Sequence, residues 1–169
     1  MKLQTKIVFA LLTTLLSLSF VCNVSFAQHD LINRLGVGMS NQLMNDITSI
    51  SLKMQKSEQF AAGILFGLST SDKKGGYGAG IKLNRILFVE PQLNFYSSVL
   101  LGLINKKTAT TSDTGFQCDG TLGSEFHFSG LQSLGFSFEF GVSVNKINND
   151  FNIQTTGYHF ITAAIHFYL

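Results

Sequence analysis

Hydrophobic and polar residues alternate with a period of two along much of the chain. In the stretch LGFSFEFGVSVN, residues 134–145, one parity consists of Leu, Phe and Val, and the other consists of Gly, Ser, Glu and Asn. Such alternation predicts a β-strand with one apolar and one polar face. A soluble strand turns its polar face to water, but this polar face is mostly glycine and serine. The other segments are needed to decide which face lies outside.

The same pattern recurs and predicts an all-β protein of eight antiparallel strands. Residues 41–56 are ambiguous, because Leu43, Ile47, Ile50 and Met54 also have helical spacing. The β-branched residues and serines of this segment favour a strand. The predicted strands span residues 33–40, 47–56, 59–69, 76–87, 92–105, 114–128, 133–146 and 157–168.

The predicted connections alternate between long polar loops and short turns. Because neighbouring strands run in opposite directions, all long loops fall at one end of the sheet. The only proline, Pro91, falls in a short turn, where it costs no ladder hydrogen bond. An even strand number with this alternation predicts a closed up-and-down antiparallel barrel. The long loops are residues 40–46, 69–76, 105–115 and 145–157.

The side-chain volumes indicate which face of this barrel is inside. The lumen of an eight-stranded barrel is only just wide enough for side chains, so it cannot hold the many Phe, Leu and Ile residues. If the bulky parity faces lipid, glycines of the other parity make room inside, and closure pairs every backbone group within the bilayer. These glycines are Gly36, Gly38, Gly63, Gly67, Gly78, Gly80, Gly123, Gly135 and Gly141.

The first 27 residues predict export. Lys2 and Lys6 precede an apolar run, and small residues end at Ala27, where we expect signal-peptide cleavage. An uncleaved anchor and a lipoprotein signal at Cys22 are the alternatives. We therefore expect a signal peptide at 1–27 and one barrel domain at 28–169.

Composition excludes several classes of function. The domain at 28–169 has balanced basic and acidic residues, which is not typical of nucleic-acid binding. Cys118 is its only cysteine, so an intramolecular disulfide and the usual zinc frameworks are excluded. We expect no cofactor. Charged residues are only 13% of the chain, which is thin coverage for a soluble surface.

Together these features resemble the small outer-membrane β-barrels of the OmpA/OmpX type. In those proteins the last strand carries apolar residues at alternate positions back from the terminus, as Ile161, Ala163, Ile165, Phe167 and Leu169 do here. The resemblance implies a cell-envelope protein of the Gram-negative outer membrane. It concerns the architecture and implies no activity. It also implies contact with outer-membrane lipid and lipopolysaccharide, recognition of the C-terminal strand by the barrel-assembly machinery, and a monomer.

The strand parity points a set of polar residues into the lumen. Buried polar groups need partners, so we interpret this set as an ion-paired and hydrogen-bonded plug. A narrow water or ion path is the alternative. The set consists of Arg34, Lys53, Lys82, Gln92, Asn94, Gln117, Asp119, Glu125, His127, Glu139 and His166.

Lysines gather in the long loops or at their bases. These lysines could bind lipopolysaccharide phosphates. Alternatively, they belong to a solvated loop surface on which neighbouring aspartates balance their charge. These lysines are Lys73, Lys74, Lys106, Lys107 and Lys146.

The favoured functional hypothesis is a structural or surface-interaction role, with four longer extracellular loops displayed on a rigid barrel. A small porin-like pore and a soluble periplasmic lipid-binding barrel are the alternatives. A lipid A-modifying enzyme ranks below them. For such an enzyme, His159 with Thr155 or Thr156 is the candidate catalytic pair, and no Ser-His-carboxylate spacing supports it.

Overall fold

The computed structural model describes residues 31–45, 47–71, 74–108, 110–147, 150–156 and 161–169. No helix in these ranges is long and apolar enough to cross a membrane. The expected signal peptide lies outside the described residues. The strands are β1 (Leu35–Ser40), β2 (Ser49–Ser57), β3 (Phe60–Ser69), β4 (Lys74–Glu90), β5 (Leu93–Thr108), β6 (Ser112–Phe128), β7 (Leu131–Ile147), β8 (Asp150–Thr155) and β9 (Thr162–Tyr168).

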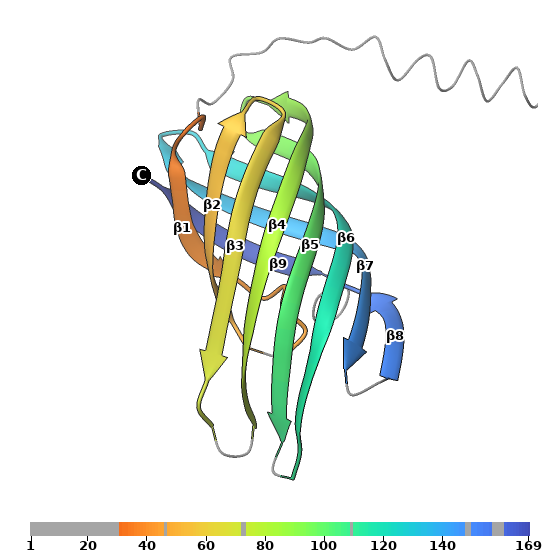
Figure 1. Cartoon of the computed structure of the whole chain (residues 1–169). Helices are drawn as coiled ribbons and strands as arrows, with labels where there is room; N and C mark the ends of the chain where they lie inside the picture. The colour runs from red at the N-terminus through yellow and green to blue at the C-terminus, as the bar shows by residue number, and fades with distance from the viewer. Residues whose placement is uncertain (1–30, 46, 72–73, 109, 148–149, 157–160) are drawn as a thin grey trace, which may run out of the picture.

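Eight of these strands close into one antiparallel barrel (Figure 1). Strands β1 to β7 pair with one another in sequence order. Strand β9 pairs with both β7 and β1 and so closes the barrel. This is an up-and-down order, with β8 added beside β7 as a short ninth strand. The predicted all-β, closed, eight-stranded fold is confirmed.

The strands are staggered around the barrel. Following directly paired residues from Phe167 of β9 through β1 to β6 leads to Val144 of β7. The β7 residue that pairs with Phe167 from the other side is Leu134, so one circuit shifts the register from 134 to 144, or 10 residues. Closure of a barrel requires such a stagger, and it tilts the strands against the barrel axis.

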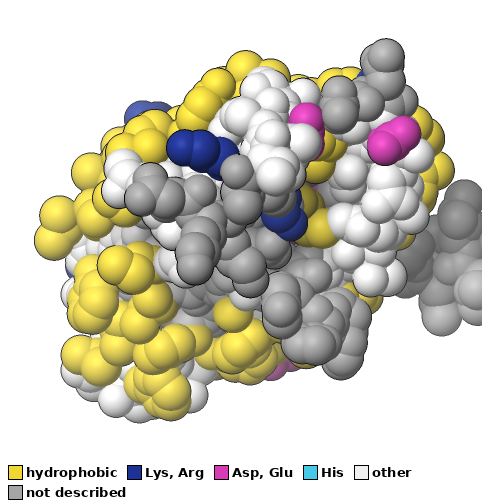
Figure 2. Space-filling view, turned by 90° about the horizontal axis from the view of Figure 1, so that it is seen from below, with side chains coloured by type: hydrophobic (Ala, Val, Ile, Leu, Met, Phe, Trp, Pro, Cys, Tyr) yellow, Lys and Arg dark blue, Asp and Glu magenta, His cyan; other side chains and the backbone are white. Residues whose placement is uncertain are grey.

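The bulky parity lies outside. Leu101 at the middle of β5 and Phe140 of β7 are 61% and 54% exposed, whereas the neighbouring Leu100 and Glu139 are buried. Viewed from the loop end, hydrophobic side chains surround the barrel (Figure 2). This arrangement answers the question that the Gly- and Ser-rich face of β7 raised, because that face points into the lumen.

Glycines of the inward parity leave room for long polar side chains. Gly63 of β3 lies directly between Lys53 of β2 and Lys82 of β4, and Gly36 of β1 flanks Lys53 on its other side. A Cβ atom at Gly63 would come within 2.7 Å of a backbone oxygen. Glycine at position 63 therefore lets the backbones of β2 and β3 approach closely beside Lys53.

The turns at the other end are short, as predicted. Pro91 and Gln92 connect β4 to β5, and Ser129 and Gly130 connect β6 to β7. Gly130 has a φ of 83°, in the left-handed region that glycine adopts without strain. These two-residue connections fix the register of the two hairpins.

Three features differ from the sequence-based expectation. Part of the loop expected at 145–157 forms β8, and β4, β5 and β6 extend further into the loop end than expected. The loop expected at 40–46 turns into the barrel, where Gln42, Leu43 and Asn45 are buried. Residues 49–56 of the ambiguous segment belong to strand β2, as favoured.

Candidate functional site: the barrel lumen

The lumen contains three buried carboxylates, each of which accepts several hydrogen bonds. Glu139 of β7 forms an ion pair with Lys82 and accepts a hydrogen bond from the Tyr96 hydroxyl at 2.8 Å. Its second oxygen accepts hydrogen bonds from Thr121 at 2.7 Å and Ser98 at 3.3 Å. Four strands thus contribute to one carboxylate, which ties β4, β5, β6 and β7 together from inside.

Glu125 of β6 is the centre of a second cluster. Its Oε2 lies 2.7 Å from the Lys53 ammonium, and its Oε1 accepts a hydrogen bond from the Tyr168 hydroxyl at 2.6 Å. His127 Nε2 lies 3.7 Å from Oε2, and the Lys53 ammonium also lies 5.1 Å from the centre of the Tyr96 ring. This cluster connects β2 and β9 to β6 across the barrel.

Asp119 is the third carboxylate, and its partners are amides. It is fully buried, and its Oδ2 accepts hydrogen bonds from Gln117 at 2.8 Å and Gln42 at 3.2 Å. The Gln42 side-chain oxygen in turn accepts a hydrogen bond from Lys82 at 2.7 Å. Gln42 therefore connects the Asp119 site to the Lys82–Glu139 pair.

Gln42 belongs to the inward-turned connection between β1 and β2, and we name residues 42–45 the plug segment. Gln117 holds this segment by two further hydrogen bonds, from its amide nitrogen to the Gln42 carbonyl at 3.1 Å and from the Met44 N–H to its side-chain oxygen at 2.9 Å. Leu43 is the apolar member of the segment. Polar contacts from β4 and β6 therefore fix its backbone and its amide.

Leu43 packs in an apolar seat on the barrel wall. The seat is formed by Leu65, Leu100 and Ile104, which are all at most 3% exposed. Gly78 and Gly102 form its floor, and a Cβ atom at Gly78 would lie only 2.8 Å from a Leu43 methyl carbon. The wall is thus shaped around this leucine.

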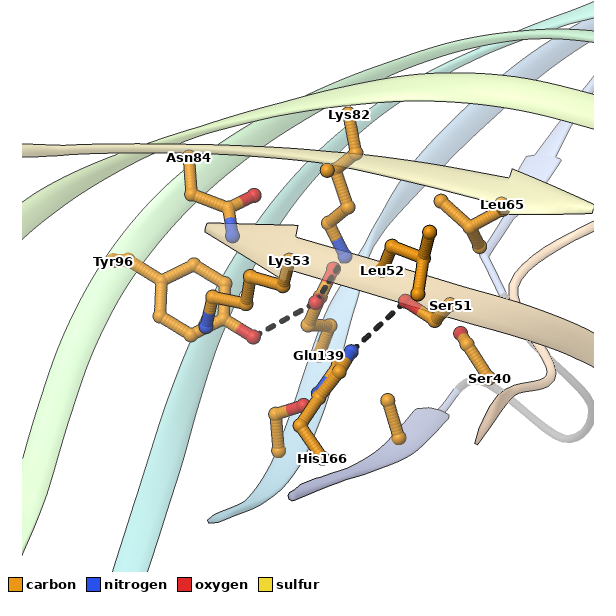
Figure 3. Close-up of a pocket in the computed structure, with 13 residues that line it drawn as sticks. Ser40, Ser51, Leu52, Lys53, Leu65, Lys82, Asn84, Tyr96, Glu139 and His166 are labelled. Atoms are coloured by element: carbon orange, nitrogen blue, oxygen red, sulfur yellow. Dashed lines mark hydrogen bonds and ion pairs between the residues drawn. The ribbon is translucent and has the colours of Figure 1, made fainter. Parts of the chain in front are cut away.

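The remaining free space in the lumen is small. A cavity lies among Lys53, Lys82, Tyr96, Glu139 and His166 (Figure 3). Its volume is about 20 Å³, counted as the space open to the centre of a water molecule. In this view Lys82 and Tyr96 point to Glu139, and His166 lies 2.9 Å from the Ser51 hydroxyl. Roughly 10–15 Å³ of such volume is needed for one water molecule, so the cavity has no room for an organic ligand.

The structure brings most of the expected lumen residues together. Lys53, Lys82, Gln117, Asp119, Glu125, His127, Glu139 and His166 all lie inside. Asn94 is also buried, whereas Gln92 is exposed in the turn between β4 and β5.

Arg34 lies apart from this cluster, at the end of the barrel where β1 begins. Its guanidinium donates hydrogen bonds to the Tyr168 carbonyl at 2.6 Å and to the Ser133 hydroxyl at 2.9 Å. Arg34 therefore joins the first strand to the last strand and to β7, and does not balance a lumen carboxylate.

The loop lysines are spread along the rim. Lys107 of β5 and Lys146 of β7 are exposed, and Lys106 is partly buried. Lys74 is described only as the first residue of β4, and Lys73 lies outside the described residues. Among the described lysines at this end, those whose exposure is known therefore lie on β5 and β7.

Sequence reasoning missed several members of the site. Tyr168 and Thr121 were on the inward parity, but hydroxyl groups gave no reason to single them out. Gln42 was placed in a surface loop. One signal did mark the plug segment: Leu100 and Ile104 disturb the alternation of their strand, and both are part of the seat of Leu43.

The candidate metal-ligating and catalytic residues lie only partly within the described ranges. No group of three or more His, Cys, Asp and Glu side chains there is suited to a metal ion. Thr155 is exposed, Thr156 is buried, and His159 lies outside the described residues.

The arrangement has no counterpart that would assign it an activity. No protein-family model, curated protein or solved structure matches this chain. The conclusions below therefore depend on the chain's own geometry.

Proposed function

We propose that the protein is an integral outer-membrane β-barrel of the OmpA/OmpX type, with a structural or surface-interaction role. The observation that carries the proposal is the inversion of the barrel. Leucine, isoleucine, valine and phenylalanine cover its outside, and its ion pairs lie inside. Contiguous apolar surface of this extent is not typical of a soluble monomer, whereas lipid would cover it.

One row of paired residues illustrates this outer surface. Ile64, Ile81, Leu101, Cys118 and Val144 lie side by side on β3 to β7. The row passes the middle of the barrel wall, and none of its side chains is charged or strongly polar. A barrel of this kind satisfies its backbone polar groups within the sheet, which a lipid environment requires.

The interior disfavours a soluble lipid-binding barrel. A lipid carrier needs an apolar cavity, whereas the described lumen contains the ion pairs of Lys53 with Glu125 and of Lys82 with Glu139. The cavity beside these pairs has room for about one water molecule. The same packing disfavours a constitutive pore. The two ion pairs and the plug segment lie in the interior through which ions would have to pass.

The first test is heat-modifiability combined with fractionation. We expect the protein to remain in the envelope pellet after osmotic shock and to require detergent for extraction. Unboiled protein should run at a different apparent size from boiled protein in SDS gels, because a closed barrel resists SDS until heated. Release in the shock fluid without a mobility shift would contradict the proposal.

At the loop end, we propose contact between exposed lysines and lipopolysaccharide phosphates. Lys107 and Lys146 are exposed there, and basic side chains attract anionic headgroups. The double variant Lys107→Gln/Lys146→Gln should retain less lipopolysaccharide after detergent extraction than the parent protein. Lys56→Gln is the matched control, because Lys56 is an exposed lysine near the opposite end. Equal retention in both variants would count against the contact.

We also propose that the barrel-assembly machinery recognises β9. Its outward residues Ala163, Ile165 and Phe167 form the apolar edge pattern on which the resemblance rests. The barrel then closes by pairing β9 with β1, so recognition of β9 would precede closure. Substituting Phe167 by serine should slow assembly in cells while leaving refolding in detergent unchanged.

A further inference from the structure

We propose that the plug segment is a detachable closure of the lumen, which can leave its seat while the barrel stays closed. Its departure would open a water-filled vestibule at the loop end that admits small cations. The inference does not depend on the membrane location, since it concerns only the interior of the barrel.

The hydrogen bonds that close the barrel and those that hold the plug segment are separate. The barrel closes through the ladders of β1 with β2 and of β1 with β9, which end at Ser40. In the described residues, no rung of either ladder includes residues 42–45. Their polar contacts go to the side chains of Gln117, Asp119 and Lys82. Two local hydrogen bonds add to these, from the Gln42 N–H to the Ser40 hydroxyl at 3.3 Å and from the Ile47 N–H to Asn45 Oδ1 at 3.3 Å. Removing the plug segment would therefore break no strand pairing.

The seat is formed by the wall and not by the plug segment itself. Leu65, Leu100 and Ile104 lie on β3 and β5, and the glycine floor lies on β4 and β5. These residues are fixed by the ladders whether or not Leu43 is present. The departure of Leu43 would leave a recess between rigid strands, which water from the loop end would fill.

The charges of the lumen favour cations in this vestibule. The described interior contains three carboxylates, of Asp119, Glu125 and Glu139, against the two ammonium groups of Lys53 and Lys82. Glu125 and Glu139 are paired with the lysines, so Asp119 carries the excess negative charge. It is also the carboxylate that Gln42 covers.

A buried cysteine can report whether the vestibule opens. Ser143 is fully buried and lies directly opposite Asp119. The probe protein carries Ser143→Cys, with Cys22 and Cys118 replaced by alanine. The test variant adds Gln42→Ala/Leu43→Asn, which removes the amide link and places a polar group in the apolar seat. The matched control adds Leu43→Met, which keeps an apolar side chain of similar volume.

The measurement is the reaction rate of the probe cysteine with small methanethiosulfonate reagents, together with the SDS mobility shift. We expect the test variant to keep the shift and to react at least tenfold faster than the parent and the Leu43→Met control. A cationic reagent should react faster than an anionic one of similar size. Loss of the shift would show that the plug segment is required for closure and would overturn the proposal.

Equal reaction rates in all three proteins would also overturn it, because the plug segment would then not control access. A second variant approaches the seat from the wall. Gly78→Ala places a methyl group against Leu43 without changing the plug segment. This variant should also raise the reaction rate of the probe cysteine. An unchanged rate would contradict the proposal that Leu43 is held in this seat.

Discussion

The Lys53 ammonium lies 2.7 Å from the Glu125 carboxylate inside the barrel, although the two residues are far apart in sequence. Both side chains are at least nine-tenths buried, so each charge depends on the other for its main compensation. Lys53→Met leaves Glu125 buried without its cation, which costs about 3–5 kcal/mol in comparable pairs. We expect that loss in urea unfolding of the refolded protein, and little change for the exposed control Lys56→Met. Equal free energies of unfolding for Lys53→Met and the parent protein would show that the ion pair does not stabilise the barrel.

Two glycines of β6 should respond differently to the same substitution. A Cβ atom at Gly123 would lie 2.6 Å from Glu139 Cγ and 2.9 Å from the Tyr96 ring, whereas one at Gly120 would meet nothing within 4 Å. Gly123→Ala should therefore destabilise the barrel by about 1–3 kcal/mol through overpacking. Gly120→Ala should stay within about 0.5 kcal/mol. The comparison uses unfolding midpoints, and a larger effect at Gly120 would contradict the inward and outward assignments.

A charge on the outside distinguishes lipid from water. Leu101 lies at the middle of the wall and is 61% exposed. If it faces lipid, Leu101→Arg should cost about 2–4 kcal/mol in vesicles, and Leu131→Arg, at the turn end, should cost about 0–1 kcal/mol. The measurement is unfolding from lipid vesicles. Equal, small costs at both positions would indicate a surface covered by water.

The absence of tryptophan makes a single introduced tryptophan a clean reporter. Phe138→Trp places it on the outer face of β7, and Ser71→Trp places it in the connection after β3. In vesicles with brominated acyl chains, we expect blue-shifted and quenched emission at position 138 and unquenched emission at position 71. Reversed quenching would mean that the outer face of β7 is not in lipid.

The strands were predictable because each one obeys a single rule along most of its length. In the segment 114–128, for example, Phe116, Leu122 and Phe126 lie outside, and Gln117 and Glu125 lie inside, as their parity predicts. A period of two fixes the face of every residue once one residue is placed. The structure agrees with that choice throughout the described part of this strand.

Strand β8 was missed because its surroundings look like a loop. Asn148 and Asn149 precede it and Asp150 begins it, and Asn and Asp are typical turn formers. Yet Phe151 and Ile153 alternate with Asn152 and Gln154, which is the same period-two signal over six residues. Its pairing with β7 depends on how far that strand extends beyond β9, and this length is set by the whole barrel.

The plug segment was not predictable from its own sequence. Gln42 and Asn45 are polar, and polarity at a strand end indicates a solvated loop. Their burial depends on partners distant in sequence, above all Gln117 and Asp119. Only the inward leucine and isoleucine of β5 indicated that something apolar would enter the lumen.

The inverted barrel also determines how the chain can change over generations. On the outside, side chains such as those of Leu101 and Leu103 are mostly exposed, so one large apolar residue can replace another. Inside, Gly63, Gly123 and Glu139 each fit one set of neighbours. Divergence should therefore be fastest on the hydrophobic surface and slowest among the polar residues, the reverse of the substitution pattern of a water-soluble domain.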